Sequence, residues 1–277
     1  MIEPAALASL RRIASRANPL IKEWAGLKDK ANRDALGLTL AEGANMAAEG
    51  LAASSRGFFR PAAFIVSDSG AARPEAGGLL AKAAESGAQL FNLADDCYGK
   101  ISWLGGADGL ALVMAFTAEP LDLKAVFAAP SPRWLAAIGV QDPGNAGALA
   151  RTALAAGFDG CLFLDCADPH SPKFLRGSMG AAFRLPCLSL ASDAFRRDWK
   201  PSFAKLVAAV PGTEADDFRA ADYAPPLALL VGGERGIPED IENLAAARVR
   251  IPLHNGVESL NLAVAAGIIL FEAERCR

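Results

Sequence analysis

Short apolar runs alternate with amphipathic segments along most of the chain, a pattern typical of strands that alternate with helices. In the first part of the chain, apolar runs predict strands at 36–40, 62–66, 89–93 and 110–116. Further strands are expected at 134–140, 161–164, 185–190, 205–210, 227–231 and 249–251. Helices are expected at 19–30, 148–156 and 259–274. The alternation predicts an α/β fold with a mostly parallel sheet that is covered on both faces.

A proline-rich stretch divides this pattern into two blocks. Pro120, Pro130 and Pro132 fall between the strands predicted at 110–116 and 134–140, and prolines of this kind favour a linker. We therefore expect a first domain at 1–116, a linker at 117–133 and a second domain at 134–277. Each block of this 277-residue chain is long enough to bury a core of its own.

The composition places the chain among globular proteins, because hydrophobic residues make up 52% and charged residues 21%. No apolar run is long enough to span a bilayer, and residues 1–30 lack an export signal. We therefore expect a cytoplasmic protein. Its five cysteines form no CxxC pair and it has only two histidines, so we expect neither a disulfide framework nor a metal site.

The net charge of −3 hides a basic segment at the start of the chain. Residues 1–33 hold seven lysines and arginines against three acidic side chains, an excess of +4. A local basic face can attract phosphate groups even when the whole protein is acidic. A solvated helix face would explain these charges equally well.

Three loops follow predicted strands and combine glycines with polar groups, at the edge of a parallel sheet where ligands bind. The first loop contains Gly144, Asn145 and Gly147. We expect Asn145 at the N-cap of the following helix, where its side chain can accept from exposed backbone N–H groups. Arg151 follows about two turns into that helix, and an arginine among apolar residues needs a carboxylate or phosphate partner. A simple cap with an arginine that reaches solvent is the alternative.

The second and third loops offer hydrogen bonds without a strong charge. The second runs from Leu230 to Pro238, and its backbone groups could hold the sugar or the amino acid part of a cofactor. In the third, Ser259 is expected to cap the closing helix and Asn261 to lie on its first turn. Amide and hydroxyl groups suit a neutral adenine or ribose. Taken singly, each loop is also compatible with a plain turn.

Several well-known motifs are absent from the sequence. It contains no GxxxxGK[ST] loop, no GxGxxG after an early strand, no HExxH and no GxSxG. These absences argue against a P-loop nucleotide site, a dinucleotide-binding domain, a zinc protease and a hydrolase of the nucleophile-elbow type.

Three segments, in this order and at this spacing, resemble the SpoU/TrmH family of the SPOUT methyltransferase superfamily. They are DPGNAGALARTALAAG (142–157), LLVGGERGIP (229–238) and IPLHNGVESLNLAVAAGIILFE (251–272). The segment 171–186 is similar to the family too, and 18–43 looks like the amino-terminal substrate-binding domain of many members. Leu253 and Leu262 stand where methionine and valine are common, and both are apolar replacements of similar volume.

The resemblance implies a carboxyl-terminal SPOUT domain with a trefoil knot and an amino-terminal RNA-binding domain of the L30e type. It implies an obligate homodimer whose active site lies near the subunit interface, and S-adenosylmethionine (AdoMet) as cofactor. The implied reaction is 2′-O-ribose methylation of structured RNA, and the extra domain favours ribosomal RNA over transfer RNA.

The resemblance also assigns roles to individual residues. The implied catalytic positions are Asn145, Arg151, Glu234, Ser259 and Asn261. The implied AdoMet-binding positions are Leu230, Gly232, Gly236, Ile251, Leu253 and Leu260, with contacts largely through the main chain. The basic residues expected to contact RNA are Arg11, Arg12, Lys22, Lys28, Arg33, Lys173 and Arg176.

Four alternatives stay open at this point. The chain could methylate transfer RNA, methylate a base, bind RNA or assist ribosome assembly without catalysis, or act on a small molecule. The separate first domain argues for a macromolecular substrate. The polar set formed by Asn145, Arg151, Ser259 and Asn261 favours ribose chemistry, by analogy with the family.

Overall fold

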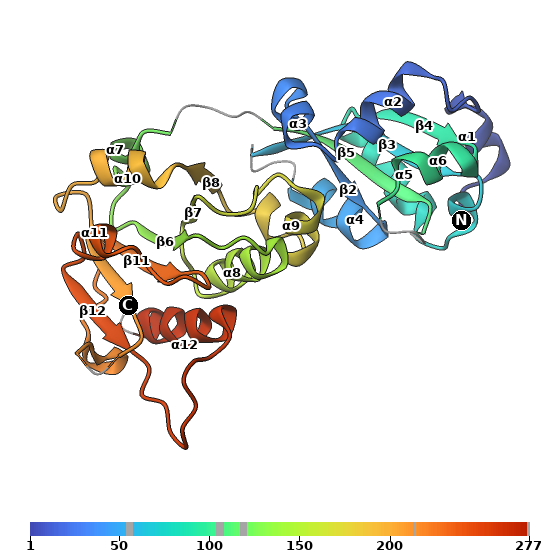
Figure 1. Ribbon diagram of the computed structural model, residues 1–277. Coiled ribbons are helices and arrows are strands. Elements are labelled where there is room, and N and C mark those ends of the chain that lie inside the picture. Colours follow the sequence, from blue (N-terminus) through green and yellow to red (C-terminus); the bar gives the residue numbers. More distant parts are fainter. Residues whose placement is uncertain (54–57, 104–107, 117–120, 213, 276–277) are drawn as a thin grey trace. The chain divides into compact units, whose positions relative to one another are not determined.

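The computed structural model describes residues 1–53, 58–103, 108–116, 121–212 and 214–275 (Figure 1). By its internal contacts the chain divides into two compact units. The first comprises Met1–Glu119 and His170–Arg184, and the second comprises Pro120–Pro169 and Leu185–Arg277. Segment 170–184 therefore groups with the first unit, whereas the expected boundary placed it in the second domain.

The first unit is built on a mixed five-stranded sheet in the order β1-β4-β3-β5-β2. The strands β1, β4 and β3 are parallel, whereas β5 is antiparallel to both of its neighbours, β3 and β2. The strand bounds are β1 (Arg11–Ile13), β2 (Leu38–Glu42), β3 (Phe59–Ser67), β4 (Gln89–Leu93) and β5 (Leu110–Phe116). The helices that accompany this sheet are α1 (Pro4–Ala8), α2 (Pro19–Gly26), α3 (Lys30–Leu36), α4 (Ala44–Ala53), α5 (Ala76–Glu85) and α6 (Asp95–Ile101).

Segment 170–184 forms the short helix α9 (Pro172–Gly177) and a single turn of 3-10 helix, η3 (Ala181–Phe183). The imidazole of His170 stacks on the ring of Phe116, with ring centroids 3.9 Å apart. The hydroxyl of Thr39 donates a hydrogen bond to the carbonyl oxygen of His170 at 2.6 Å. Arg184 forms an ion pair with Glu49 on α4. These contacts explain why the segment belongs to the first unit.

The second unit contains a seven-stranded sheet in the order β10-β12-β9-β11-β6-β7-β8, and all of its paired strands are parallel. This confirms the expected parallel α/β architecture. The strand bounds are β6 (Arg133–Ile138), β7 (Gly160–Leu164), β8 (Cys187–Leu190), β9 (Lys205–Ala209), β10 (Asp216–Asp217), β11 (Leu227–Gly232) and β12 (Ala247–Arg250). The central strands β6, β7 and β11 are almost entirely buried, as their continuous apolar runs predict.

Five α-helices accompany this sheet in the described part of the second unit: α7 (Leu123–Val126), α8 (Pro143–Ala155), α10 (Ser192–Asp198), α11 (Glu239–Glu242) and α12 (Leu262–Arg275). Helix α12 packs along α8, side by side in Figure 1. The strand order reverses between β6 and β11. On one side of β6 lie β7 and β8, and on its other side lie β11, β9 and β12. Ligands bind in open parallel sheets at such a reversal, at the carboxyl ends of the strands.

All ten predicted strands are present, with ends shifted by a few residues, and two very short edge strands, β1 and β10, were missed. The helix expected at 19–30 ends at Gly26, and a separate helix begins at Lys30. Of the expected linker at 117–133, residues 117–120 lie outside the described residues, and Leu123–Val126 form α7. Within the described residues, no helix is both long and apolar enough to cross a membrane.

Candidate active site

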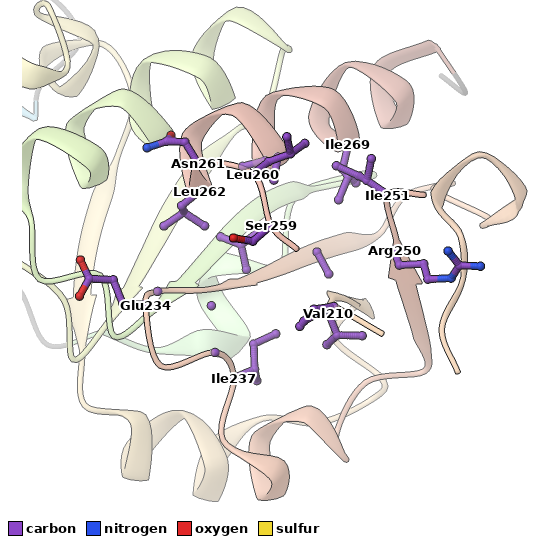
Figure 2. A pocket seen from close by; sticks show the side chains of 18 of the residues that line it. Val210, Glu234, Ile237, Arg250, Ile251, Ser259, Leu260, Asn261, Leu262 and Ile269 are labelled. Atoms are coloured by element: carbon purple, nitrogen blue, oxygen red, sulfur yellow. The ribbon is translucent and has the colours of Figure 1, made fainter. Parts of the chain in front are cut away.

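A cavity of about 960 Å³ lies at the carboxyl edge of the seven-stranded sheet (Figure 2). Four segments that follow β6, β9, β11 and β12 line it, together with one face of α12. Figure 2 shows Glu234 and Asn261 at one end of the cavity and Arg250 at the opposite end. Apolar side chains such as Val210, Ile251 and Ile269 lie between them.

The first wall is the start of helix α8. The helix begins at Pro143, earlier than expected, and Asp142 is its N-cap. The Oδ1 atom of Asp142 accepts a hydrogen bond from the backbone N–H of Asn145 at 2.7 Å. The prediction that Asn145 caps this helix is therefore wrong, because Pro143 suits the first helical position and Asp142 supplies the cap. Asn145 lies in the first turn and lines the cavity.

The second wall is the turn after β11, and its glycines are required by backbone packing. A Cβ atom on Gly232 would lie 2.5 Å from the carbonyl carbon of Gly236, and one on Gly233 would lie 2.4 Å from the carbonyl oxygen of Gly139. The N–H of Gly233 donates to the carbonyl of Ile138 at 2.8 Å, which ties this turn to the end of β6. The tight turn brings Glu234 to the cavity.

The third wall is the segment between β12 and α12. Asn261 is the residue that caps α12, since its Oδ1 atom accepts from the backbone N–H groups of Ala263 at 2.9 Å and Val264 at 3.4 Å. Helix α12 begins at Leu262, so the expected start at residue 259 and the expected cap by Ser259 are wrong. Ser259 and Leu260 precede the helix and line the cavity (Figure 2).

The structure brings together nine of the eleven residues that the resemblance assigns to catalysis and cofactor binding. These nine line one cavity: Asn145, Gly232, Glu234, Gly236, Ile251, Leu253, Ser259, Leu260 and Asn261. Leu230 is not part of the lining, and its side chain is fully buried in the core of the second unit, so a contact of Leu230 with the cofactor stays a prediction. Arg151 is exposed on α8 and also lies outside the lining of the cavity.

Sequence reasoning missed the wall that follows β9. Residues Val210, Pro211 and Gly212 line the cavity there, as do Arg248 and Arg250 on β12. The Pro211-Gly212 dipeptide after a predicted strand is a turn signal, and it could have identified this loop. No sequence signal marks the two arginines, because the assembly of the sheet decides which residues of β12 reach the cavity.

The basic residues expected to contact RNA fall into three groups. Arg11, Lys22, Lys28, Lys173 and Arg176 are exposed. Arg33 is buried, and its Nη1 atom donates to the carbonyl oxygens of Leu27 at 2.7 Å and Lys28 at 2.8 Å. The prediction that Arg33 contacts RNA is therefore wrong, because its guanidinium holds the chain that leaves α2.

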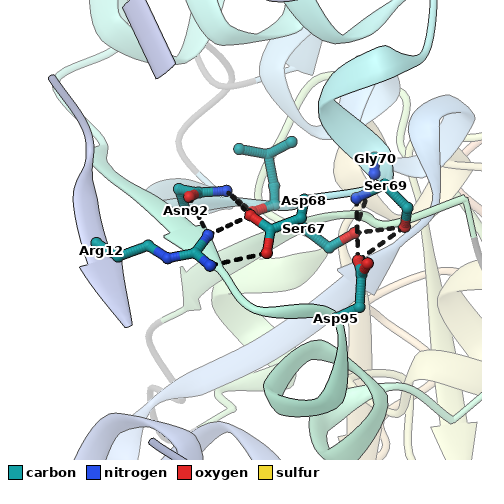
Figure 3. Close-up of polar contacts among 8 residues, drawn as sticks. Arg12, Ser67, Asp68, Ser69, Gly70, Asn92 and Asp95 are labelled. Carbon is teal, nitrogen blue, oxygen red and sulfur yellow. Dashed lines mark hydrogen bonds and ion pairs between the residues drawn. The ribbon is translucent and has the colours of Figure 1, made fainter. Parts of the chain in front are cut away.

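Arg12 forms the third group, since an acidic partner balances its charge (Figure 3). Its Nη2 atom lies 2.7 Å from Oδ2 of Asp68, and its Nη1 atom also contacts Asn92. The hydrogen bond from Arg12 holds the pKa of Asp68 below its ordinary value. The neighbouring Asp95 carboxylate accepts from the backbone N–H and the hydroxyl of Ser69, which lowers the pKa of Asp95.

The sequence profile of the SpoU rRNA Methylase family matches residues 132–271, half of the chain. This match spans every wall of the cavity. The chain belongs to the SpoU rRNA Methylase family.

Similar proteins agree with this membership. An uncharacterized tRNA/rRNA methyltransferase of Synechocystis is 38% identical over 139 residues, which are 49% of this chain and half of that relative's length. The 23S rRNA (guanosine(2553)-2′-O)-methyltransferase RlmP of Bacillus subtilis is 27% identical over 95% of this chain and 98% of its own. An AdoMet-bound rRNA methyltransferase from Sinorhizobium meliloti matches 96% of this chain and 98% of its own, with a TM-score of 0.81 and 28% identity.

The assignment of the α12 cap can be tested by stability. Replacing Asn261 by alanine removes the acceptor for two backbone N–H groups, so we expect a loss of about 1 kcal/mol in the free energy of unfolding. The matched variant Ser259→Ala is expected to change it by less than about 0.5 kcal/mol. Urea unfolding followed by circular dichroism measures both values, and equal losses in the two variants would contradict the assignment.

Proposed function

We propose that this protein transfers the methyl group of AdoMet to a ribose 2′-hydroxyl of structured RNA, with ribosomal RNA as the favoured substrate. The observation that carries the proposal is that the three segments that resemble the family all line one cavity. Its relative RlmP is named as a 23S rRNA 2′-O-methyltransferase and aligns with almost the whole chain. We place this reaction in the cytoplasm.

The cavity suits AdoMet in size and chemistry. Its volume of about 960 Å³ falls within the range of small-molecule sites. Gly232 and Gly233 pack against backbone and also line the cavity, so their main-chain groups are available to hydrogen-bond a ligand. Apolar side chains such as Ile251, Leu253 and Leu260 can cover an adenine, while their backbone groups offer hydrogen bonds. AdoMet supplies an electrophilic methyl group at its sulfonium.

The chain's own residues would align the acceptor, whose hydroxyl loses one proton in the reaction. A ribose hydroxyl must lose its proton during attack, and in-line placement of the reacting atoms supplies much of the rate. Asn145 would orient the ribose, and Glu234 would fix the turn after β11. Arg151 stays protonated in proteins, so we assign it to the phosphate of the acceptor nucleotide, while the hydroxyl proton is relayed to water as the O–CH3 bond forms and the S–CH3 bond breaks.

A homodimer is the assembly that we propose, because α12 carries an apolar face beside the cavity. Val264, Ile268 and Phe271 follow one another at helical spacing and are 53%, 38% and 51% exposed. A second copy of this chain would cover this face. Because Arg151 lies outside the cavity of its own chain, a dimer could also bring it to the cavity of the partner subunit.

The first unit would bind the RNA substrate as an L30e-type domain. Its exposed cations Arg11, Lys22 and Lys28 support this role, and Lys173 and Arg176 group with the same unit. Transfer RNA is the second candidate substrate, because the Synechocystis relative is named as a tRNA/rRNA methyltransferase. A non-catalytic RNA-binding protein is disfavoured, because four of the five predicted catalytic residues, Asn145, Glu234, Ser259 and Asn261, line the cavity.

The proposed reaction can be tested with labelled AdoMet and total RNA from cells that lack this protein. After nuclease digestion we expect a labelled 2′-O-methylnucleoside, and fractionation of the RNA beforehand would name the substrate. The variant Arg151→Ala should lose turnover while its affinity for AdoMet stays nearly unchanged. A labelled base would overturn the ribose assignment, and equal losses of turnover and AdoMet affinity would overturn the role of Arg151.

The RNA surface can be tested through the salt dependence of binding. The double variant Lys22→Glu with Lys28→Glu should weaken RNA binding, and the slope of log K against log salt should become shallower by roughly 0.7–0.9 for each phosphate that is no longer neutralised. The control Arg197→Glu changes an exposed arginine of the second unit that pairs with Asp198. An unchanged slope in the double variant would place the RNA elsewhere.

The dimer can be tested by sedimentation equilibrium. Phe271→Asp puts a charge in the apolar face of α12, so a wild-type dimer is expected to become a monomer. Leu36→Asp serves as the control, because Leu36 is an exposed apolar residue of the first unit, at 44% exposure. A wild-type monomer at micromolar concentration would contradict the proposed assembly.

A further inference from the structure

The connection between β6 and α8, residues 139–142, leads directly into the first wall of the cavity. Val140 and Gln141 line the cavity, and Asp142 caps the helix that carries Asn145. The position of this connection therefore determines where the first loop stands relative to the other walls.

Backbone and side-chain hydrogen bonds attach this connection to the end of the neighbouring strand β7. The N–H of Gly139 donates to Leu164 at 2.9 Å, and the carbonyl of Val140 accepts from the N–H of Ala167 at 2.8 Å. The side-chain amide of Gln141 donates to the carbonyl of Asp165 at 2.6 Å. On its other side, the carbonyl of Gly139 meets Gly233 of the second wall with no space for a Cβ atom.

One hydrogen bond of this set is accepted by the sulfur of a thiol. The backbone N–H of Val140 donates to Sγ of Cys166 at 3.2 Å. The same sulfur lies 3.3 Å from the carbonyl oxygen of Ala137 and 3.2 Å from that of Leu164, so its hydrogen can be donated to either. Burial raises the pKa of the Cys166 thiol to about 11, so it stays protonated near neutral pH and both donates and accepts.

We propose that Cys166 is a positioning residue for the cofactor cavity. Its thiol satisfies the N–H of Val140 and holds residues 139–142 between the end of β7 and the turn at Gly232–Glu234. The thiol itself is not among the groups that line the cavity. The inference rests on the proposed function in one respect, because it takes AdoMet as the ligand of the cavity.

A valine at this position has one side-chain heavy atom more than cysteine and no acceptor, so the N–H of Val140 loses its partner. We expect Cys166→Val to weaken AdoMet binding by about tenfold, the equivalent of one buried hydrogen bond. Cys166→Ser retains a donor and an acceptor, and is expected to stay within about threefold of wild type. Isothermal titration calorimetry on the full chain measures all three affinities.

Cys161→Val is the matched control, because Cys161 is a buried thiol on β7, the strand that precedes Cys166, and is not part of the cavity lining. It should leave AdoMet affinity unchanged, whatever its effect on the melting temperature. Wild-type affinity in Cys166→Val, or an equal loss in Cys161→Val, would overturn the positioning role.

Hydrogen exchange at the amide of Val140 gives a readout that does not depend on AdoMet. Exchange should accelerate in Cys166→Val and remain slow in Cys166→Ser and Cys161→Val. If wild type bound no AdoMet, the proposed function would fail, while the exchange rates would still decide whether the thiol holds the loop. Unchanged exchange in Cys166→Val would overturn the inference by itself.

Discussion

The contact between two backbones at the carboxyl ends of β6 and β11 is the constraint on which the rest of the cavity depends. Gly233 approaches the carbonyl of Gly139 so closely that a single added carbon would lie 2.4 Å from it. Because β6 and β11 are neighbours in the sheet, the loops after them must leave the same edge within one strand spacing. Glycine at 233 is the residue that lets the two loops pass, and Asn145 and Glu234 reach one cavity as a result.

The sequence was most informative where the signal is local. Continuous apolar runs identify the buried strands β6, β7 and β11, and the polar loops that follow β6 and β11 mark the edge where the cavity lies. It was least informative about which of two neighbouring polar residues caps a helix. Asp142 and Asn145 both suit an N-cap, as do Ser259 and Asn261, and the choice depends on where the chain leaves the preceding strand. Contacts across the fold, such as the thiol of Cys166 with Val140, have no local signal.

The number of basic residues in the sequence differs from the number of cations that the structure leaves without an acidic or carbonyl partner close by. The first 33 residues carry an excess of positive charge, yet their cations are not equivalent. Arg33 donates hydrogen bonds to backbone carbonyls, Arg12 forms an ion pair with Asp68, and Lys30 forms an ion pair with Asp34. A count of basic residues therefore overstates the charge available to a phosphate backbone. The cations that remain are fewer, and their arrangement follows from which carboxylates the fold places beside them.

Because it includes segment 170–184, the first unit is built from two separate stretches of the chain. Because this segment belongs to the first unit and is flanked in sequence by strands of the second, the chain passes between the units three times. The first unit is thus discontinuous, and no single cut of the chain could release it whole. An expression fragment that ends near residue 119 would lack the stacking partner of Phe116 and the ion-pair partner of Glu49. A first unit that includes a segment lying between two strands of the second unit cannot be exchanged whole by simple recombination at the linker.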